Sequence, residues 1–464
     1  MDEITKARRS TLMNRDNETL TSLEKKPISI LVIKYSLPSL AIVAVSGSYN
    51  IVDGIFLGRS LGITANSVNS YVFLLYMVIF SFCILISQGA CTILTIYLGE
   101  KKQRTAEDVI GTSIFLAIIV SLILAIVIKM NLNNITNLLN ISSEDRVFFN
   151  DYFNNFLQYL PIYFLSHILT YILRAQGKAF LVMCLSFQSF AVNVLLGFIF
   201  IITLNWGFTG SSASTIGANL SSCIISYIYM KGKKRNIKLC LEKIKYNKIL
   251  IQEVITTGVP QFIMNLASVF LLLIYNEVAK HYAGYYGLAA LSIGSSIYRY
   301  ITLVMNAITN GIQPIIGYNY GAQNFIRVKK TLNFTLALAS IISCTLTFLI
   351  QFYAIQIIKL YNYNDLNFEA FAVVGIRLVL LALPLQGIIS ISTSYFQNIK
   401  KTKVSMILII LRQVVFQIPL AIGLPYVLGI NGLWHSFWIS DVMIAIVSIF
   451  LLNINRKKLK GDQL

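Results

Sequence analysis

Four acidic residues stand inside long apolar segments of this sequence: Asp53, Glu253, Glu277 and Asp441. A charge at the centre of a bilayer costs about 2.5–3.5 kcal/mol on insertion scales, so each of them needs a physical reason. Glu253 stands at the start of its segment, where we expect water to solvate it. Glu277 has Lys280 nearby as an ion-pair partner, and Asp441 is expected to pair with Arg412. Whether Glu277 and Asp441 do more than this stays open here.

Asp53 differs from the other three because of what precedes it. Pro38 lies fifteen residues earlier in the same apolar segment, and Tyr49 lies one helical turn before Asp53 on the same face. A proline removes a backbone hydrogen bond and gives a helix a place to bend. A carboxyl tolerates apolar surroundings when neutral and needs water or a cation when ionised. We therefore predict that Asp53 exchanges a proton and that Pro38 is the hinge; the alternative is that Asp53 only hydrogen-bonds within its bundle.

Aromatic side chains in the apolar segments offer faces to organic cations. The tyrosines considered are Tyr71, Tyr76, Tyr275, Tyr298 and Tyr300. The residues predicted to line a substrate cavity are Tyr275, Asn276, Arg299 and Tyr300. The alternative is that the tyrosines serve packing. Guanidinium groups do not deprotonate, so Arg299, Arg377 and Arg412 are poor proton carriers.

Motifs of enzymatic chemistry are missing. The sequence has no HExxH, P-loop, GxSxG or CxxC motif, so metalloprotease, ATP-driven and hydrolase mechanisms lack their residues. We predict a protein that is not an enzyme, with no cofactor and no certain metal site. Without an ATP motif, any uphill transport must draw on an ion gradient.

The helices that position these residues can be predicted from the composition and from the length of the apolar runs. Of the 464 residues, 56% are apolar and 12% are charged, about half the ~25% charge of soluble domains. Runs long enough to span a bilayer, which takes ~20 residues, cover 29–57, 70–97, 107–130, 148–172, 180–204, 209–230, 252–280, 288–318, 331–358, 367–396, 404–428 and 430–454. We predict an all-α polytopic membrane protein with twelve transmembrane helices, since helices satisfy every backbone group in lipid.

Basic residues are concentrated in alternate gaps between these segments and in the two termini, and together these regions hold 29 of the 38 Lys and Arg. By the positive-inside rule both termini are cytoplasmic. This topology explains the formal charge of +19 without nucleic acid. Residues 1–28 are predicted to be a cytoplasmic extension, 231–251 a basic linker and 455–464 a cytoplasmic tail.

An internal repeat relates the two halves of the chain. An offset of 222 residues joins Pro38 to Pro260, Gly89 to Gly311, Gly99 to Gly321, Lys178 to Lys400, Gly207 to Gly429 and Gly210 to Gly432. We predict two six-helix lobes, 29–230 and 252–454. Because six is even, both lobes enter the membrane in the same direction, and their pseudo-two-fold axis lies along the membrane normal.

Several stretches resemble the multidrug and toxic compound extrusion (MATE) family, in particular its MepA-like branch. They are YNIVDGIFLGRSLG (49–62), GACTILTIYLGEKKQRTAEDVIGT (89–112), GVPQFIMN (258–265) and NGIQPIIGYNYGAQNFIRVKK (310–330). The resemblance implies two V-shaped six-helix lobes and the export of organic cations and other amphipathic drugs in exchange for H⁺ or Na⁺.

Site residues follow from the same resemblance. Asp53 matches the family's helix-1 carboxylate, Tyr49 its neighbour, Asn193 the helix-5 asparagine and Thr215 the helix-6 threonine of the cation site. Gly197 stands where the family often has a second carboxylate. A dehydrated Na⁺ needs several hard oxygen ligands, so this departure favours coupling to H⁺.

The predicted function is a secondary active antiporter that works by alternating access. We expect a monomer in the plasma membrane whose partners are small organic cations and the lipid bilayer. The alternative is a flippase of a lipid-linked precursor from the same superfamily, which usually calls for extra helices or a cluster of cationic residues in the cavity.

Overall fold

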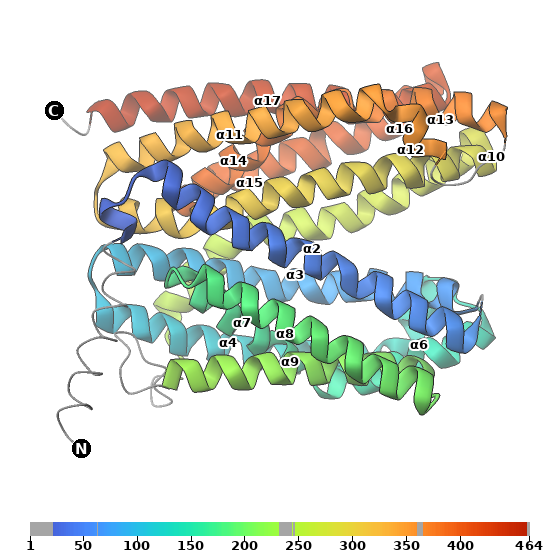
Figure 1. Cartoon of the computed structure of the whole chain (residues 1–464), viewed down its shortest axis with the longest axis horizontal. Coiled ribbons are helices and arrows are strands. Elements are labelled where there is room, and N and C mark those ends of the chain that lie inside the picture. Colours follow the sequence, from blue (N-terminus) through green and yellow to red (C-terminus); the bar gives the residue numbers. More distant parts are fainter. Residues whose placement is uncertain (1–21, 63, 232–243, 245, 360–364, 462–464) are drawn as a thin grey trace. The chain divides into compact units, whose positions relative to one another are not determined.

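The computed structural model describes residues 22–62, 64–231, 244, 246–359 and 365–461. These residues form helices and short connections, without a strand (Figure 1). The elements are α2 (Ile28–Leu61), α3 (Thr64–Gly99), α4 (Gln103–Met130), α5 (Leu132–Leu138), α6 (Ser143–Gln158), α7 (Leu160–Ala175), α8 (Ala179–Gly197), η1 (Phe198–Thr203), α9 (Gly207–Lys231), α10 (Lys248–Gly321), α11 (Phe325–Phe352), α12 (Ala354–Lys359), α13 (Leu366–Val379), η3 (Leu383–Leu385), α14 (Gln386–Asn398), α15 (Thr402–Ile410), η4 (Leu411–Gln417), α16 (Ile418–Leu428) and α17 (Ile430–Gly461). Most of the predicted extension and linker, and part of the tail, lie outside the described residues.

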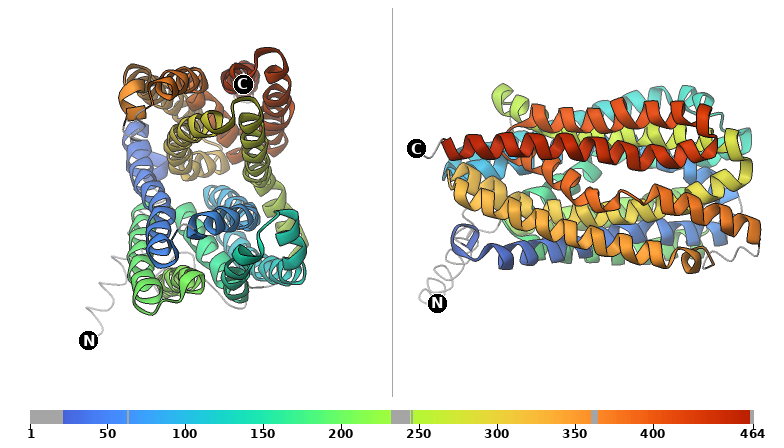
Figure 2. Two further views of the ribbon diagram at one scale, coloured as in Figure 1. Left: turned by 90° about the vertical axis from the view of Figure 1, so that its right-hand side faces the viewer. Right: turned by 90° about the horizontal axis from the view of Figure 1, so that it is seen from above.

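Two compact units make up the fold. The N-terminal unit comprises Leu37–Phe262, Gly317–Gln323 and the described residues before Ile28; the C-terminal unit comprises Ile28–Ser36, Ile263–Ile316 and the chain from Asn324. Seen end-on, the helices of each unit form a bundle (Figure 2). The division crosses α2 next to Pro38 and α10 close to Pro260. The two repeated prolines therefore stand where a helix passes from one unit to the other.

Nine helices of the described chain are long and apolar enough to cross a membrane, and α6 with α7, bent by 61°, makes a tenth span. Helix α10 contains two of the twelve predicted spans, separated at Gly284, where φ is 53°. Helix α9 is the twelfth span. It is rich in Ser and Gly, but it is helical over the whole of the predicted span 209–230. The prediction of an all-α polytopic membrane fold is confirmed.

Two of the predicted spans are interrupted beside a proline. The span 148–172 breaks at Tyr159 between α6 and α7, beside Pro161. The span 367–396 breaks between α13 and α14, where η3 contains Pro384. Proline has no N–H to donate and its ring clashes with the preceding turn, so a helix ends or bends there. The two breaks fall at nearly corresponding places of the repeat.

Glycine permits backbone contact between α3 and the first part of α10. A Cβ added at Gly89 would lie 2.0 Å from the carbonyl oxygen of Val254, and one at Gly258 would lie 1.8 Å from that of Leu85. No side chain fits at such distances. Gly89, one of the glycines that carried the repeat, thus has a packing reason in the N-terminal unit.

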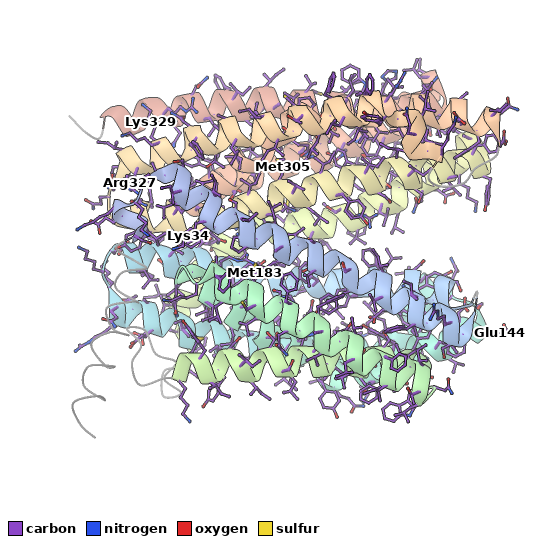
Figure 3. The ribbon with its side chains drawn as sticks, viewed as in Figure 1. Lys34, Glu144, Met183, Met305, Arg327 and Lys329 are labelled. Atoms are coloured by element: carbon purple, nitrogen blue, oxygen red, sulfur yellow. The ribbon has the colours of Figure 1, made fainter. Side chains whose placement is uncertain are left out.

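Charged side chains mark the helix ends. In the C-terminal unit, Arg327 and Lys329 lie at the end of the bundle where α17 finishes (Figure 3). Lys401 at the same end bonds to the side chain of Asn455. This clustering agrees with the basic loops read from the sequence.

Candidate functional site

Asp53 lies in the second half of α2 and faces α9 inside the N-terminal unit. Its Oδ2 accepts a hydrogen bond from the Ser211 hydroxyl at 3.4 Å. Its Oδ1 is buried and has no hydrogen-bond partner. Among the described residues no basic side chain forms an ion pair with it. A carboxyl with one long hydrogen bond and a free oxygen is unsaturated, so a proton or a cation can be accommodated.

Asn193 on α8 is connected to this carboxyl through α9. Its Nδ2 donates to the Ser214 hydroxyl at 3.4 Å, and the Ser214 hydroxyl donates to the carbonyl oxygen of Ser211 at 2.8 Å. Asn193 is fully buried, and its Oδ1 has no partner. Asp53 and Asn193 therefore each keep a buried oxygen acceptor without a donor. The residues present fit a proton or a small cation as cargo.

Tyr49 and Thr215 flank this group in different ways. The Tyr49 ring packs edge-on against Phe190, with the ring centroids 5.3 Å apart. Thr215 is half-buried, and its carbonyl oxygen accepts from Asn219 at 2.8 Å. The hydrogen bond to Asp53 comes from Ser211, one turn before Thr215 on α9.

Sequence reasoning missed Ser211 and Ser214. The signal was present in the run Gly210-Ser211-Ser212-Ala213-Ser214-Thr215, since residues three apart share a helix face. What the run does not reveal is which face points at Asp53.

The place of a second carboxylate is filled by an aromatic ring. A Cβ on Gly197 would lie 3.2 Å from the ring of Phe56 and 3.8 Å from the Ser214 hydroxyl. An apolar pocket lies beside it, lined by Phe56, Phe190, Ala191, Val194, Leu195 and Phe198. Asp53 is therefore the only carboxylate that the described residues bring to this group. Nowhere in the described chain do three or more His, Cys, Asp or Glu side chains gather as a metal site.

The C-terminal unit buries a different polar cluster. Asp441 on α17 is 1% exposed. Its Oδ1 accepts from Arg412 Nη2 at 3.0 Å and Nε at 3.2 Å. Its Oδ2 accepts from the Tyr298 hydroxyl at 3.0 Å and from Gln386 Nε2 at 3.1 Å. The predicted pairing of Asp441 with Arg412 is confirmed, and this carboxylate is saturated with donors.

The four residues predicted to line a substrate cavity do not converge in the C-terminal unit. Tyr275 is buried in the core and stacks on Phe437, with centroids 4.5 Å apart. Asn276, Arg299 and Tyr300 are exposed. Their assignment to the cavity stays a prediction.

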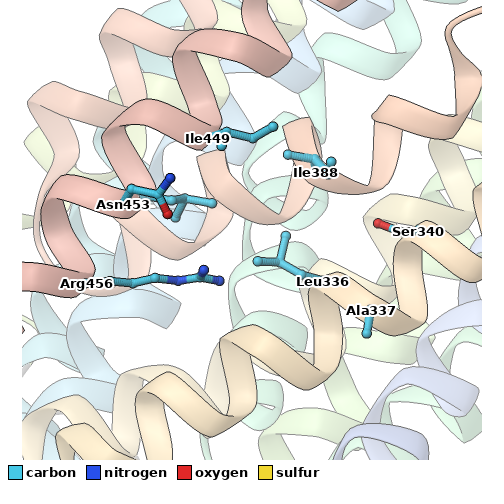
Figure 4. Close-up of a pocket in the computed structure, with 8 residues that line it drawn as sticks. Leu336, Ala337, Ser340, Ile388, Ile449, Asn453 and Arg456 are labelled. Carbon is cyan, nitrogen blue, oxygen red and sulfur yellow. The ribbon is translucent and has the colours of Figure 1, made fainter.

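Another pocket in the C-terminal unit, of about 210 Å³, is mostly apolar (Figure 4). Its lining is Leu336, Ala337, Ser340, Ile388, Ile449, Leu452, Asn453 and Arg456. The Arg456 guanidinium donates to Asn333 Oδ1 at 2.7 Å. No carboxylate lines this pocket, so it offers no second ion-coupling site.

The described helices, long and apolar enough to cross a membrane and gathered in two units, define the class: a polytopic all-α membrane protein with a two-lobe fold. A family model described as MatE matches residues 38–199 and again residues 260–422. The second match begins 222 residues after the first, which confirms the repeat. The chain belongs to the MATE family of transporters.

Individual relatives and structures agree with this assignment. The Multidrug export protein MepA of Staphylococcus haemolyticus is 24% identical over 447 residues, with 96% of this chain and 98% of that protein covered. MepA of Staphylococcus aureus is 24% identical over 454 residues, with the same coverage. A crystal structure of MATE in the bent conformation has a TM-score of 0.90 at 20% identity, covering 96% of this chain and 98% of the other. An outward-facing MATE family transporter has a TM-score of 0.88 at 20% identity, covering 95% and 98%.

Proposed function

We propose that the protein is a secondary active antiporter that exports organic cations and other amphipathic drugs in exchange for H⁺. It resides in the plasma membrane with both termini in the cytoplasm and works by alternating access. Relatives that match nearly the whole chain are multidrug export proteins, which supports drugs as the substrate class. The alternating placement of basic loops supports the orientation.

The observation that carries this proposal is the unsaturated carboxyl of Asp53. An ion can drive transport only if it binds two states of the carrier unequally. Protonating Asp53 removes a charge from the interior of the bundle, where an unpaired charge is costly. The neutral form therefore favours a closed arrangement around Asp53, and the ionised form favours an arrangement that admits water or a cation. Pro38 in the same helix gives that change a place to occur.

Coupling to H⁺ is favoured over Na⁺ by what surrounds Asp53. A sodium ion needs several oxygens and usually more than one carboxylate. Among the described residues, no second carboxylate stands beside Asp53: Gly197 has no side chain, and the Phe56 ring lies 3.2 Å from where its Cβ would be. One carboxylate and one amide oxygen suffice for a proton, which needs a single acceptor.

The driving force is modest. When one proton exchanges for one monovalent cation, no net charge moves, and each pH unit supplies about 1.4 kcal/mol, or roughly tenfold accumulation. Export of a neutral compound would also gain about 2.3 kcal/mol per 100 mV of membrane potential.

The test is flux in reconstituted vesicles. Wild type, Asp53→Asn and the matched control Glu277→Gln, an exposed acid of the C-terminal unit, are each given a pH jump or a Na⁺ jump separately. We expect ethidium flux after the pH jump in wild type and Glu277→Gln, and none above empty vesicles in Asp53→Asn. A Na⁺ requirement at constant pH would overturn the choice of ion. Undiminished flux in Asp53→Asn would overturn the role of Asp53, and no drug flux in wild type would favour the lipid-linked flippase.

A further inference from the structure

A seam of polar and aromatic side chains runs between α3 and α7 in the N-terminal unit. On α7 it consists of Tyr163, His167, Tyr171 and Arg174, whose spacing of four, four and three residues places them on one helix face. They extend over about 16 Å of helix axis. The facing residues on α3 are Tyr76, Phe80, Cys83, Ser87 and Cys91, which also share a face.

Contacts connect the two faces in register. The Tyr163 hydroxyl donates to the Tyr76 hydroxyl at 2.9 Å. The His167 ring packs against Tyr163 with centroids 4.7 Å apart, and against Phe80 at 5.7 Å. Tyr76 also interacts electrostatically with Asp53. The seam therefore begins within electrostatic range of the carboxyl that we propose to carry the proton.

Arg174 closes the other end of the seam. It is 6% exposed and lies one residue before the end of α7, at the predicted cytoplasmic side. Its guanidinium lies over the Tyr171 ring at 4.3 Å. Its Nε and Nη1 are buried and have no hydrogen-bond partner. Among the described residues of its unit, no carboxylate pairs with it.

A buried cation without a counter-ion is costly, so its position needs a reason. The charged and titratable groups that act on the seam come from α2, α3, α6 and α7 in the described chain: Tyr49, Asp53, Tyr76, Cys83, Cys91, Tyr152, Tyr163, His167 and Tyr171. The one carboxylate among them is Asp53, at the far end. Arg174 therefore presents a positive charge without a counter-ion to any hydrogen ion that moves along the seam towards the cytoplasm.

We propose that Arg174 is an electrostatic barrier that stops hydrogen ions from passing through the N-terminal unit between Asp53 and the cytoplasm. An antiporter must not let its coupling ion cross alone, yet tyrosine and histidine side chains can pass protons along a hydrogen-bonded row. A fixed guanidinium repels a proton on His167 and cannot itself release one. Arginine excludes protons and cations in the same way in membrane pores. The inference rests on the proposed proton coupling at Asp53.

The experiment measures proton leak without drug. Purified full-length protein is reconstituted in vesicles that contain pyranine, and a potassium diffusion potential with valinomycin drives protons inward. We expect wild type, Arg174→Lys and the control Lys102→Gln, which removes an exposed cation outside the seam, to be equally tight. Arg174→Gln should leak roughly tenfold faster, the factor expected from removing a unit charge about 10 Å away at an effective dielectric constant near 20.

Two further variants keep the proposal falsifiable. Cys91→Asp leaves Arg174 in place but supplies a counter-charge from α3, since these two residues interact electrostatically, and it should leak like Arg174→Gln. Adding His167→Phe to Arg174→Gln should restore tightness. A tight, correctly folded Arg174→Gln overturns the barrier. If Arg174→Gln does not fold, a tight Cys91→Asp overturns the barrier instead. If Arg174→Gln folds and leaks, a leak that His167→Phe leaves unchanged overturns the route through His167.

The proposed function is tested separately in the same vesicles. Wild type that fails to export ethidium under a pH gradient refutes the antiporter, whatever the leak of Arg174→Gln. Wild type that exports normally, with an Arg174→Gln variant that stays tight, refutes only the barrier.

Discussion

Asp53 of the N-terminal unit and Asp441 of the C-terminal unit both lie within helical bundles, and the two acids have opposite surroundings. Asp53 in the N-terminal unit accepts one hydrogen bond of 3.4 Å and keeps a buried oxygen free. Asp441 in the C-terminal unit accepts from Arg412, Tyr298 and Gln386 at 3.0 to 3.2 Å. The first carboxyl has reason to take up a proton or cation, whereas the second is neutralised by a guanidinium that never deprotonates.

The repeat makes this difference more instructive. The offset of 222 residues places Tyr275 at the position of Asp53, and Asn219 and Phe190 at the positions of Asp441 and Arg412. The acids are therefore not copies of one another. One unit holds an acid with a buried oxygen that has no hydrogen-bond partner, and the other holds a buried ion pair. This contrast supports the proposal that ion coupling belongs to the N-terminal unit.

The largest expected effect comes from removing one partner of the fixed pair. Arg412→Gln leaves Asp441 buried without its counter-charge, and we expect a loss of about 3–5 kcal/mol in the free energy of unfolding. Thermal unfolding of the purified protein in detergent measures it. Arg377→Gln, which changes an exposed arginine of the same unit, is the control and should have little effect. Equal stability of Arg412→Gln and wild type would contradict the structural role of the pair.

Replacing both partners should be much milder. Arg412→Met combined with Asp441→Leu removes both charges, and we expect its free energy of unfolding to lie within about 1 kcal/mol of wild type, because apolar substitutes for a buried pair are often neutral. The same unfolding assay compares the double variant with Arg412→Gln. A double variant as unstable as the single one would mean that the hydrogen bonds of Tyr298 and Gln386, and not the charges, hold the cluster.

Replacing Asp53, the acid of the N-terminal unit, should have little effect on stability. Asp53→Asn keeps an oxygen acceptor for the Ser211 hydroxyl and leaves no charge uncompensated, so we expect its stability to change by at most about 1 kcal/mol. Ser211→Ala, which removes the same single hydrogen bond, should fall in that range. A loss as large as that of Arg412→Gln would show that Asp53 is also structural, and the contrast between the units would fail.

The smallest effect is expected at the N-cap residue Asp365, which we compare with the N-cap residue Ser142; each precedes a broken helix. Ser142 caps α6 by accepting from the Asp145 N–H at 3.2 Å, whereas Asp365 caps α13 by accepting from the N–H groups of Asn367 and Phe368. The Tyr286 hydroxyl, followed by these backbone N–H groups, lowers the pKa of Asp365.

A lowered pKa in the folded state means that Asp365 stabilises the fold above its ordinary pKa near 3.9, and that this contribution disappears as the pH falls through the folded-state value. We expect Asp365→Asn to lower the melting temperature slightly at pH 7, and by less as the pH is lowered below about 4. Ser142→Ala should cost about 1 kcal/mol at either pH, because a hydroxyl cap does not titrate in this range. A pH-independent loss in Asp365→Asn would mean that its charge contributes nothing.

The sequence alone determined the class of fold and the repeat, and it singled out Asp53 as the candidate acid. Apolar runs of bilayer length, basic residues in alternate loops and the offset of 222 are local or periodic properties of the chain. Asp53 stood out because the cost of a charge in lipid depends mainly on its position along one helix.

Only the tertiary structure decided which donors each acid meets. Arg412 and Tyr298 reach Asp441 from 29 and 143 residues away, and Ser211 reaches Asp53 from 158 residues away. Helical periodicity says which residues share a face, but the rotation and register of neighbouring helices depend on how their side chains interlock. For the same reason the breaks at Tyr159 and Pro384, and the seam that ends at Arg174, became visible only once the helices were packed.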